Sequence, residues 1–230
     1  MSGADAAAHW GALAAGRFIR VVNFHNTPVA RADVYERQLA GYAARFAPVT
    51  LADLDALFET GRWHHDRPGL IPVFYEGYRD HVEVALPLLE RVGLVGWFFV
   101  PTAFVATPPA EQVAFAEAHH LGIVEGEYAD GRHAMSWDEV AAVGERHVVA
   151  AHTATHASAA SVRSDDDVRR EVLEPREALE RVLGRPPAAF AWLFGQASGT
   201  NPVADEALRA AGYRYLFSNA RLQRLRPAVG

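Results

Sequence analysis

The feature that most constrains the fold is a regular alternation of short apolar segments with longer amphipathic ones. The apolar segments are typical of β-strands and cover residues 17–24, 70–74, 94–100, 147–151, 188–194 and 213–217. Between them, apolar residues recur at helical spacing, as Tyr35, Leu39, Tyr42 and Phe46 do in the segment from residue 32 to residue 46. Strands that alternate with helices, without internal repeats, predict an α/β domain with a parallel sheet.

Residue types at the ends of the helical segments predict where several helices begin and end. A long helix is expected to start at Ser164, to bend at Pro175, which has no backbone N–H, and to end at Gly184. Three further starts are predicted by capping patterns: Thr50 with Asp53, Ser136 with Glu139, and Asn201 with Pro202. Residues 1–16 are expected to form a loose leader or a short helix, and the residues after 217 a polar tail.

Two architectures have this alternation, an open doubly wound sheet and a (β/α) barrel. No Gly-x-Gly-x-x-Gly segment follows a predicted strand, so a dinucleotide-binding sheet has no support. The length of 230 residues suits one barrel. We therefore predict a (β/α) barrel with parallel strands, formed as a single domain by residues 17–230.

The composition limits the chemistry that such a barrel could perform. The chain has no cysteine, and all 22 of its basic residues are arginine. Disulfides, iron–sulfur clusters, a thiol nucleophile, a Schiff-base lysine and a P-loop lysine are therefore excluded. Any metal ion must be bound by His, Asp or Glu side chains. The net charge of -6 and the lack of a basic stripe argue against a nucleic-acid partner.

The sequence also bears on where the protein acts. No stretch approaches the roughly 20 apolar residues that span a bilayer, so no membrane association is expected. The first sixteen residues combine Asp5 with an Ala-rich run and lack the basic and apolar regions of a signal peptide. We therefore expect a cytoplasmic protein that acts on a small molecule.

Polar side chains follow the predicted strands at the points where the strands end. In either architecture these ends form one edge of the sheet, and catalytic residues lie at that edge. The residues there are His25 and Asn26 after the first strand, Tyr75, Glu76, Tyr78, Arg79 and Asp80 after the second, His152, Thr153, Thr155 and His156 after the fourth, Gly195, Gln196 and Ser198 after the fifth, and Ser218 and Asn219 after the last.

Two of these histidines have the spacing of metal ligands. His152 and His156 are four residues apart, so one helical turn would place both imidazoles on one face. With 11 histidines in the chain, such a spacing also arises by chance, and a surface or helix-capping role is the alternative. Glu76 is the carboxylate that could complete a three-ligand site. The alternative for Glu76 is a loop residue paired with Arg79.

Several ordered segments resemble the signatures of the polysaccharide deacetylases, the NodB-homology or carbohydrate esterase 4 family. The first signature is similar to FYEGYRDHVEVALPLLERVGLVGWFFVP, where the family has Phe-Asp-Asp-Gly-Tyr at the start. The second, His-Thr-x-x-His, is similar to HTATH after MSWDEV, and the third to LGRPPAAFAWLFG. VVNFHNTP resembles the opening segment of the branch that deacetylates exopolysaccharide. The resemblance covers about residues 18–226 and implies an irregular (β/α) barrel.

The resemblance also implies roles for matching residues. In the family a divalent metal ion is bound by a carboxylate and two histidines, which here would be Glu76, His152 and His156. The ion would be Zn²⁺, with Ni²⁺ or Co²⁺ as alternatives. His25 would be the acid that protonates the leaving amine, and Tyr75 falls where the family has its catalytic base. The candidates for substrate binding in the cleft are Asn26, Tyr78, Trp192 and Gln196.

Three departures from the family pattern bear on activity. Glu76 replaces the metal-binding Asp, and its extra methylene moves the carboxylate by about 1 Å. Tyr75 replaces the Asp base, and a phenol with a reference pKa near 10 is a poor base at neutral pH. Tyr75 could instead donate a hydrogen bond to an oxyanion, or Glu76 could act as the base. Leu193 stands where the third signature usually has Pro.

The leading hypothesis is a cytoplasmic, metal-dependent, deacetylase-like amidohydrolase that acts on a small N-acylated metabolite or amino sugar. It would hydrolyse a C–N bond other than a peptide bond. One alternative is a catalytically silent homologue that binds a ligand in the same cleft. The other is a barrel that has been repurposed for a non-hydrolytic biosynthetic reaction. The sequence does not indicate the oligomeric state.

Overall fold

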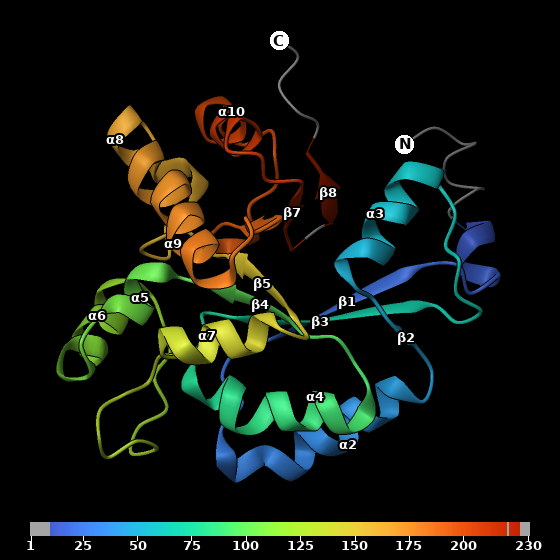
Figure 1. The fold of residues 1–230 in the computed structure, drawn as a ribbon, viewed down its shortest axis with the longest axis horizontal. Helices are drawn as coiled ribbons and strands as arrows, with labels where there is room; N and C mark the ends of the chain where they lie inside the picture. Colours follow the sequence, from blue (N-terminus) through green and yellow to red (C-terminus); the bar gives the residue numbers. More distant parts are fainter. Residues whose placement is uncertain (1–9, 220, 226–230) are drawn as a thin grey trace.

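The computed structural model describes residues 10–219 and 221–225. In this part of the chain, helices surround a curled, mostly parallel sheet (Figure 1). The strands are β1 (Ile19–Phe24), β2 (Ala47–Pro48), β3 (Gly69–Tyr75), β4 (Trp97–Val100), β5 (Val148–Ala151), β6 (Ala189–Ala191), β7 (Tyr215–Phe217) and β8 (Leu222–Arg224). The helices are α2 (Ala32–Ala43), α3 (Leu51–Thr60), α4 (Leu86–Val92), α5 (Thr102–Ala106), α6 (Gln112–Ala118), α7 (Trp137–Gly144), α8 (Asp165–Val168), α9 (Glu174–Leu183) and α10 (Pro202–Ala210). The predicted α/β class and the irregular (β/α) barrel are confirmed.

The strands lie in the order β1-β3-β4-β5-β6-β7-β8, and each neighbouring pair from β1 to β7 is parallel. β1 pairs with β3 over its whole length, from Ile19 opposite Gly69 to Phe24 opposite Phe74. Because β1 occupies one edge of β3, the other edge is shared by β2 at the start of β3 and by β4 at its end. β8 runs antiparallel to β7 and ends the sheet.

The barrel is left open along one seam. β1 and β8 lie at opposite ends of the hydrogen-bonded order, and the residues that the structure describes form no ladder between them. A groove of about 430 Å³ follows this seam, with Val21, Phe58 and Leu222 among the residues that line it. α3 packs beside the groove and is tied to β7, because the Asp55 carboxylate accepts a hydrogen bond of 2.6 Å from the Tyr215 hydroxyl.

Alternate residues of β3 separate two apolar cores. Leu70 and Phe74 pack in the larger core, between the sheet and the helices, whereas Ile71, Val73 and Tyr75 pack in the core inside the barrel. This division follows from the strand geometry, in which successive side chains point to opposite faces. A strand that is buried on both faces has to be apolar throughout, as β3 is. Tyr75 therefore points into the barrel at the carboxyl end of the strand.

The predicted helix starts are confirmed. Side-chain caps form at Thr50 with Asp53 for α3, at Ser136 with Glu139 for α7, and at Asn201 for α10. The long helix capped by Ser164 is interrupted as expected, since a π-helical turn over Arg169–Leu173 separates α8 from α9. Pro175 causes this interruption because it has no N–H for the carbonyl of the residue four positions earlier.

Two predicted boundaries are wrong. The strand expected over residues 188–194 ends at Ala191, and Leu193–Gly195 forms a 3-10 turn in which Phe194 has a φ of 61°. The tail expected after residue 217 contains β8, whose pairing with β7 compensates for its polar sequence. Of the expected leader, residues 10–14 are helical and residues 1–9 lie outside the described residues. Within the described chain, no helix is long and apolar enough to cross a membrane.

Candidate active site

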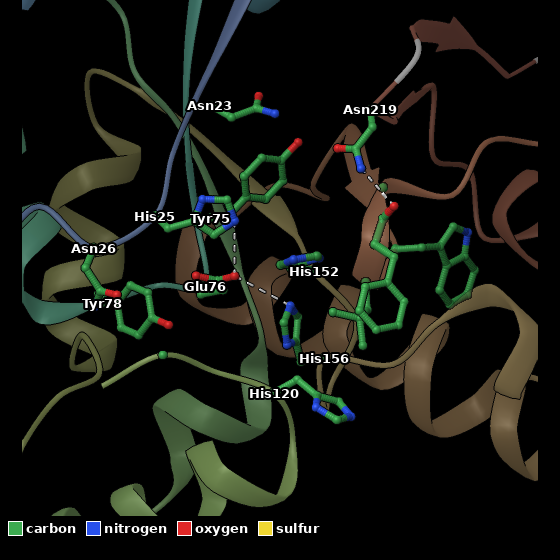
Figure 2. Close-up of a pocket in the computed structure, with 15 residues that line it drawn as sticks. Asn23, His25, Asn26, Tyr75, Glu76, Tyr78, His120, His152, His156 and Asn219 are labelled. Carbon is green, nitrogen blue, oxygen red and sulfur yellow. Dashed lines mark hydrogen bonds and ion pairs between the residues drawn. The ribbon is translucent and has the colours of Figure 1, made fainter. Parts of the chain in front are cut away.

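A pocket of about 430 Å³ lies at the carboxyl ends of the parallel strands, where the polar residues were expected to gather (Figure 2). Eight of the nine predicted site residues line it: His25, Asn26, Tyr75, Glu76, Tyr78, His152, His156 and Trp192. They come from four separate segments of the chain, which follow β1, β3, β5 and β6. The parallel order of the strands therefore brings together residues that are up to 167 positions apart (192 minus 25).

His152 and His156 are held by backbone carbonyls on the side of the ring that faces away from Glu76. Nδ1 of His152 lies 2.8 Å from the Ala191 carbonyl oxygen, and Nδ1 of His156 lies 2.8 Å from that of His119. A carbonyl oxygen can only accept, so Nδ1 carries the proton and Nε2 keeps a free lone pair. Burial lowers the pKa of His152 to about 3 and that of His156 to about 4. Both rings are therefore neutral at neutral pH.

Glu76 faces these histidines from the end of β3. Its Oε1 lies 3.8 Å from Nε2 of His156 and 3.5 Å from Nε2 of His25. Burial raises the pKa of the carboxyl to about 7. The alternative pairing with Arg79 does not occur, because the Arg79 guanidinium instead pairs with Glu83 and with another acidic side chain at 2.9 Å, that of Asp130.

The three predicted ligands have the donor types that suit a divalent cation, although their ligand atoms do not all lie within 4.8 Å of one another. Two neutral imidazoles offer Nε2 lone pairs, their rings lie with centroids 4.7 Å apart, and one carboxylate faces them. Carbonyl groups that orient ligating histidines are a regular feature of zinc sites. Two nitrogen ligands and one oxygen ligand suit Zn²⁺, Ni²⁺ or Co²⁺ better than Mg²⁺ or Ca²⁺. The assignment of Glu76, His152 and His156 as metal ligands stays a prediction.

His25 stands on a loop that buried polar groups hold in place. Its side chain is 62% exposed at the rim of the pocket, and its backbone carbonyl accepts a hydrogen bond of 2.8 Å from Nε2 of His81. Two residues further on, the backbone N–H and the hydroxyl of Thr27 both donate to the carboxylate of Asp80. Asp80 and His81 are almost completely buried. Partial burial lowers the pKa of His25 below its ordinary value, which favours the neutral ring.

Tyr75 cannot take the role of the Asp that it replaces. The phenol lies inside the barrel beside Phe99 and His152, with ring centroids 5.2 and 5.3 Å away. Burial, with the nearby Glu76 charge, raises the pKa of the phenol far above its ordinary value. Figure 2 shows the hydroxyl turned away from the Glu76 carboxylate. The group is therefore a neutral hydrogen-bond donor or acceptor rather than a base.

Gln196 does not line the pocket, so its predicted contact with substrate stays a prediction. Its Oε1 accepts a hydrogen bond from the backbone N–H of Ala159, at 2.5 Å. The reason is the early end of β6, after which the turn over Leu193–Gly195 redirects the chain. Phe194, which is 68% exposed, lines the pocket instead.

Other residues of the site had no role assigned from the sequence, although Asn219 was expected at this edge of the sheet. Asn219 follows β7, where the rule for strand ends applies, and its side-chain amide donates to the Phe194 carbonyl at 3.0 Å (Figure 2). Glu171 lies outside the pocket but shapes it, because its carboxylate accepts hydrogen bonds from the backbone N–H groups of Ala154 and Thr155. No local pattern marks Glu171, since its partners are sixteen or seventeen residues away. The other lining residues are Gly195, which was expected at a strand end, and Asn23, His120, Gly122, Leu193 and Phe194, which were not.

Unusual backbone geometry is concentrated around the pocket. Among the described residues, the non-glycine residues with positive φ are Glu76, His120, Thr153, His156 and Phe194. All but Thr153 line the pocket, and Thr153 adjoins His152. Side chains other than glycine adopt this region at a cost of order 1–3 kcal/mol each. Their gathering at one place shows that the surrounding structure holds the site in a fixed conformation.

A pocket of histidine and carboxylate side chains at the carboxyl ends of the strands lies where (β/α) barrel enzymes carry their catalytic residues. A sequence model of the polysaccharide deacetylase family matches residues 67–216, and the chain belongs to this family. The resemblance seen in the sequence is thereby confirmed. No curated protein sequence matches the chain.

Solved structures with the same fold are distant in sequence. IcaB from Ammonifex degensii is 20% identical, with a TM-score of 0.60 over 91% of this chain and 87% of that one. The BpsB deacetylase domain from Bordetella bronchiseptica is 15% identical, with a TM-score of 0.63 over 92% of both chains. The deacetylase PplD from Streptococcus pyogenes, in complex with acetate, is 13% identical, with a TM-score of 0.62 over 85% and 80%. At these identities the likeness establishes the fold alone.

Proposed function

We propose that the chain is a metal-dependent deacetylase that hydrolyses the N-acetyl group of an amino sugar. The observation that carries this proposal is the meeting of Glu76, His152, His156 and His25 in one pocket of a polysaccharide deacetylase family member. The family match favours an amino sugar within a glycan over the small free metabolite that the sequence led us to expect. The products would be a free amine and acetate.

The ligand set supplies one part of the chemistry. A divalent cation bound by Glu76, His152 and His156 would polarise the amide carbonyl and activate water. The hydrogen bonds to the carbonyls of Ala191 and His119 fix both imidazoles in the tautomer that can bind a cation. Tyr75 stands where the family has its carboxylate base, and its raised pKa makes the phenol a poor replacement.

His25 supplies the proton transfers in this proposal. Its Nε2 faces the same Glu76 oxygen that faces His156, at 3.5 Å, and it is not one of the proposed ligands. A neutral ring can accept the proton that water loses on attack. The resulting imidazolium then returns that proton to the amine nitrogen as the C–N bond breaks. One residue thus serves as base and then as acid, and its loop is held by Asp80 and His81.

The experiment measures acetate release from N-acetylglucosamine and its short oligomers after loading the protein with Zn²⁺, Ni²⁺ or Co²⁺. We expect release to require the cation and to be abolished in His156→Ala. In His25→Gln the rate should fall by roughly 10²–10⁴-fold while the bound cation is retained. An activated aryl acetate, whose leaving group needs no proton, should lose less activity in the same variant, because only the role of His25 as a base is then lost.

The catalytically silent homologue is the second candidate, and the replacement of the family base by Tyr75 favours it. Under that alternative the wild type would bind the oligomers and the cation without releasing acetate. Acetate release from N-acetylglucosamine but not from its oligomers would support a small free molecule as the substrate instead. A wild-type protein that binds no cation and yet releases acetate would refute the metal-dependent mechanism.

A further inference from the structure

A second cluster of potential metal ligands lies outside the pocket, between the start of α3 and the loop that leads to β3. Oδ1 of Asp53 lies 3.0 Å from Nε2 of His64 and 3.3 Å from Nε2 of His65. All three atoms lie within 4.8 Å of one another, and no other group of three or more His, Asp or Glu in the described chain is so compact. The cluster precedes β3 and Glu76 follows it, so a strand roughly 20 Å long separates it from the pocket.

The loop is built so that two consecutive histidines face the same way. In an extended segment, neighbouring side chains point in opposite directions. Here the chain bends, and the rings of His64 and His65 lie with centroids only 4.3 Å apart. Trp63 anchors the bend, because its buried indole donates a hydrogen bond of 2.7 Å to the Arg67 carbonyl and packs 4.8 Å from the His65 ring. Gly69 makes room for this indole, since a Cβ there would meet the ring at 2.8 Å.

Asp53 is oriented by the helix cap. Its Oδ2 accepts hydrogen bonds from the backbone N–H of Thr50, at 2.8 Å, and from the Thr50 hydroxyl, at 2.6 Å. These bonds fix the carboxylate plane and direct Oδ1 toward the histidine pair. A carboxylate that is held by hydrogen bonds on one oxygen and free on the other is a usual ligand in metal sites. The side chain of Asp53 is only 16% exposed.

Two of the three separations match a tetrahedral ion, and the third is under 4.8 Å. Ligands about 2.0–2.1 Å from Zn²⁺ are separated by about 3.3 Å along each edge of the tetrahedron. The observed separations from Oδ1 to the two Nε2 atoms are 3.0 and 3.3 Å. His64 is 48% exposed and His65 32% exposed, so water can reach a fourth position. Imidazole ligands favour Zn²⁺, Ni²⁺ or Co²⁺ over Mg²⁺ and Ca²⁺.

We propose that Asp53, His64 and His65 bind a second divalent cation of the zinc type. The ion joins the first turn of α3 to the segment that enters β3. It lies far from the carboxyl end of β3, so its role is to stabilise the fold and not to act on substrate. The proposal does not depend on the proposed deacetylase activity.

The first test counts the Zn²⁺ ions that remain bound to each chain after equilibrium dialysis. We expect two ions in the wild type, one in His64→Gln/His65→Gln, and one in His152→Ala/His156→Ala. If the pocket binds no cation, the wild type should hold one ion and His64→Gln/His65→Gln none, so failure of the proposed function is distinguishable. Equal counts in the wild type and in His64→Gln/His65→Gln would overturn the proposal.

The second test measures thermal unfolding with and without Zn²⁺ in the background of His152→Ala/His156→Ala, so that only the second site contributes. With free Zn²⁺ at about 100 times its dissociation constant, the melting temperature should rise by roughly 5–10 °C. The rise should vanish when His64→Gln/His65→Gln is added. If this combined variant does not fold, Zn²⁺ titration of the single variants His64→Gln and His65→Gln decides, and an unchanged affinity in both would refute the site.

Two aspartate variants provide matched controls. Asp53→Asn keeps an oxygen that can accept the Thr50 hydrogen bonds but removes the anionic ligand, and it should weaken Zn²⁺ binding at this site by roughly 100-fold. Asp66→Asn removes an exposed carboxylate from the same loop, outside the cluster, and should leave the affinity unchanged. An equal loss in both variants would indicate a general effect of loop charge and would contradict the proposal.

Discussion

At position 75, the side chain determines whether this residue or a neighbouring one can act as the base. A carboxylate at this place could accept a proton, whereas the Tyr75 phenol keeps its own because burial raises its pKa. The phenol also belongs to the apolar core inside the barrel, where it packs against Phe99. The substitution therefore exchanges a reactive group for a packing group. In the proposed mechanism, His25 therefore carries out the proton transfers.

The hydroxyl of Tyr75 should contribute little to turnover. In Tyr75→Phe the ring and its packing are kept, so we expect the rate of acetate release to fall by less than about tenfold, below the effect of losing a general base. The free energy of unfolding should also change by less than about 1 kcal/mol, since the ring keeps its packing in the core beside Phe99. Steady-state kinetics and urea unfolding measure both quantities. A loss above 100-fold would show instead that the hydroxyl stabilises the oxyanion.

At the scale of elements, two π-helical turns support the two loops that carry the histidines. The turn over His81–Ala85, preceded by Asp80, holds the loop after β1. The turn over Arg169–Leu173 presents Glu171 to the loop after β5. A π-helical turn is a costly insertion that is found most often near functional sites. Both turns here place a buried polar side chain where a loop needs hydrogen-bond partners.

Removing the Glu171 carboxylate should loosen the loop that carries His152 and His156. Glu171→Ala leaves the N–H groups of Ala154 and Thr155 without partners, so we expect a loss of about 3 kcal/mol in the free energy of unfolding. Zn²⁺ binding at the pocket should weaken by roughly 10–100-fold.

Urea unfolding and metal titration test this prediction, with Glu174→Ala as the control. Glu174 makes only an exposed ion pair with Arg169, so its loss should cost less than about 1 kcal/mol. Equal destabilisation by the two variants would contradict a specific role for Glu171.

Features made by contacts between residues close in the sequence could be predicted, whereas several that depend on distant contacts could not. The caps at Thr50 and Ser136 are made within four residues, so the sequence pattern contains all their partners. Positions of polar residues at strand ends also follow from topology, which is why most of the pocket was predicted. Gln196 lies outside the pocket because the end of β6 depends on pairing with β5 and β7, and β8 was missed for the same reason.

Part of the site could not be predicted because its partners are backbone atoms. The carbonyls of Ala191 and His119, which orient the two histidines, carry no signature in the residue type. The positive φ of Glu76 and His156 is likewise imposed by the assembled barrel and not by local preference.

At the scale of the whole molecule, buried neutral histidines should make the fold sensitive to acid. Burial lowers the pKa of His81 to about 3, against 6.5 in the unfolded chain. Because the unfolded chain binds a proton that the folded one rejects, this contribution is lost as the pH falls below about 6.5. Between pH 6.5 and pH 5 the loss from this residue amounts to about 2 kcal/mol.

His81→Gln isolates this contribution, because the Gln amide can still donate to the His25 carbonyl but does not titrate. From pH 7 to pH 5, we expect the variant to lose about 2 kcal/mol less unfolding free energy than the wild type. Urea titrations at each pH measure the difference. Parallel pH profiles for the two proteins would contradict the prediction.

The open seam between β1 and β8 has a consequence for how the molecule is made. In the sheet order β1-β3-β4-β5-β6-β7-β8, each strand from β3 onward pairs with a strand that comes before it in the chain. β1 needs no pairing with β8, because the described residues form no closed ring. The sheet can therefore grow by addition as the chain leaves the ribosome, amino end first. Trp192 follows β6 and Asn219 follows β7, so the pocket is complete only after these segments have been synthesised. Most of the sheet can therefore form before the pocket has all of its residues.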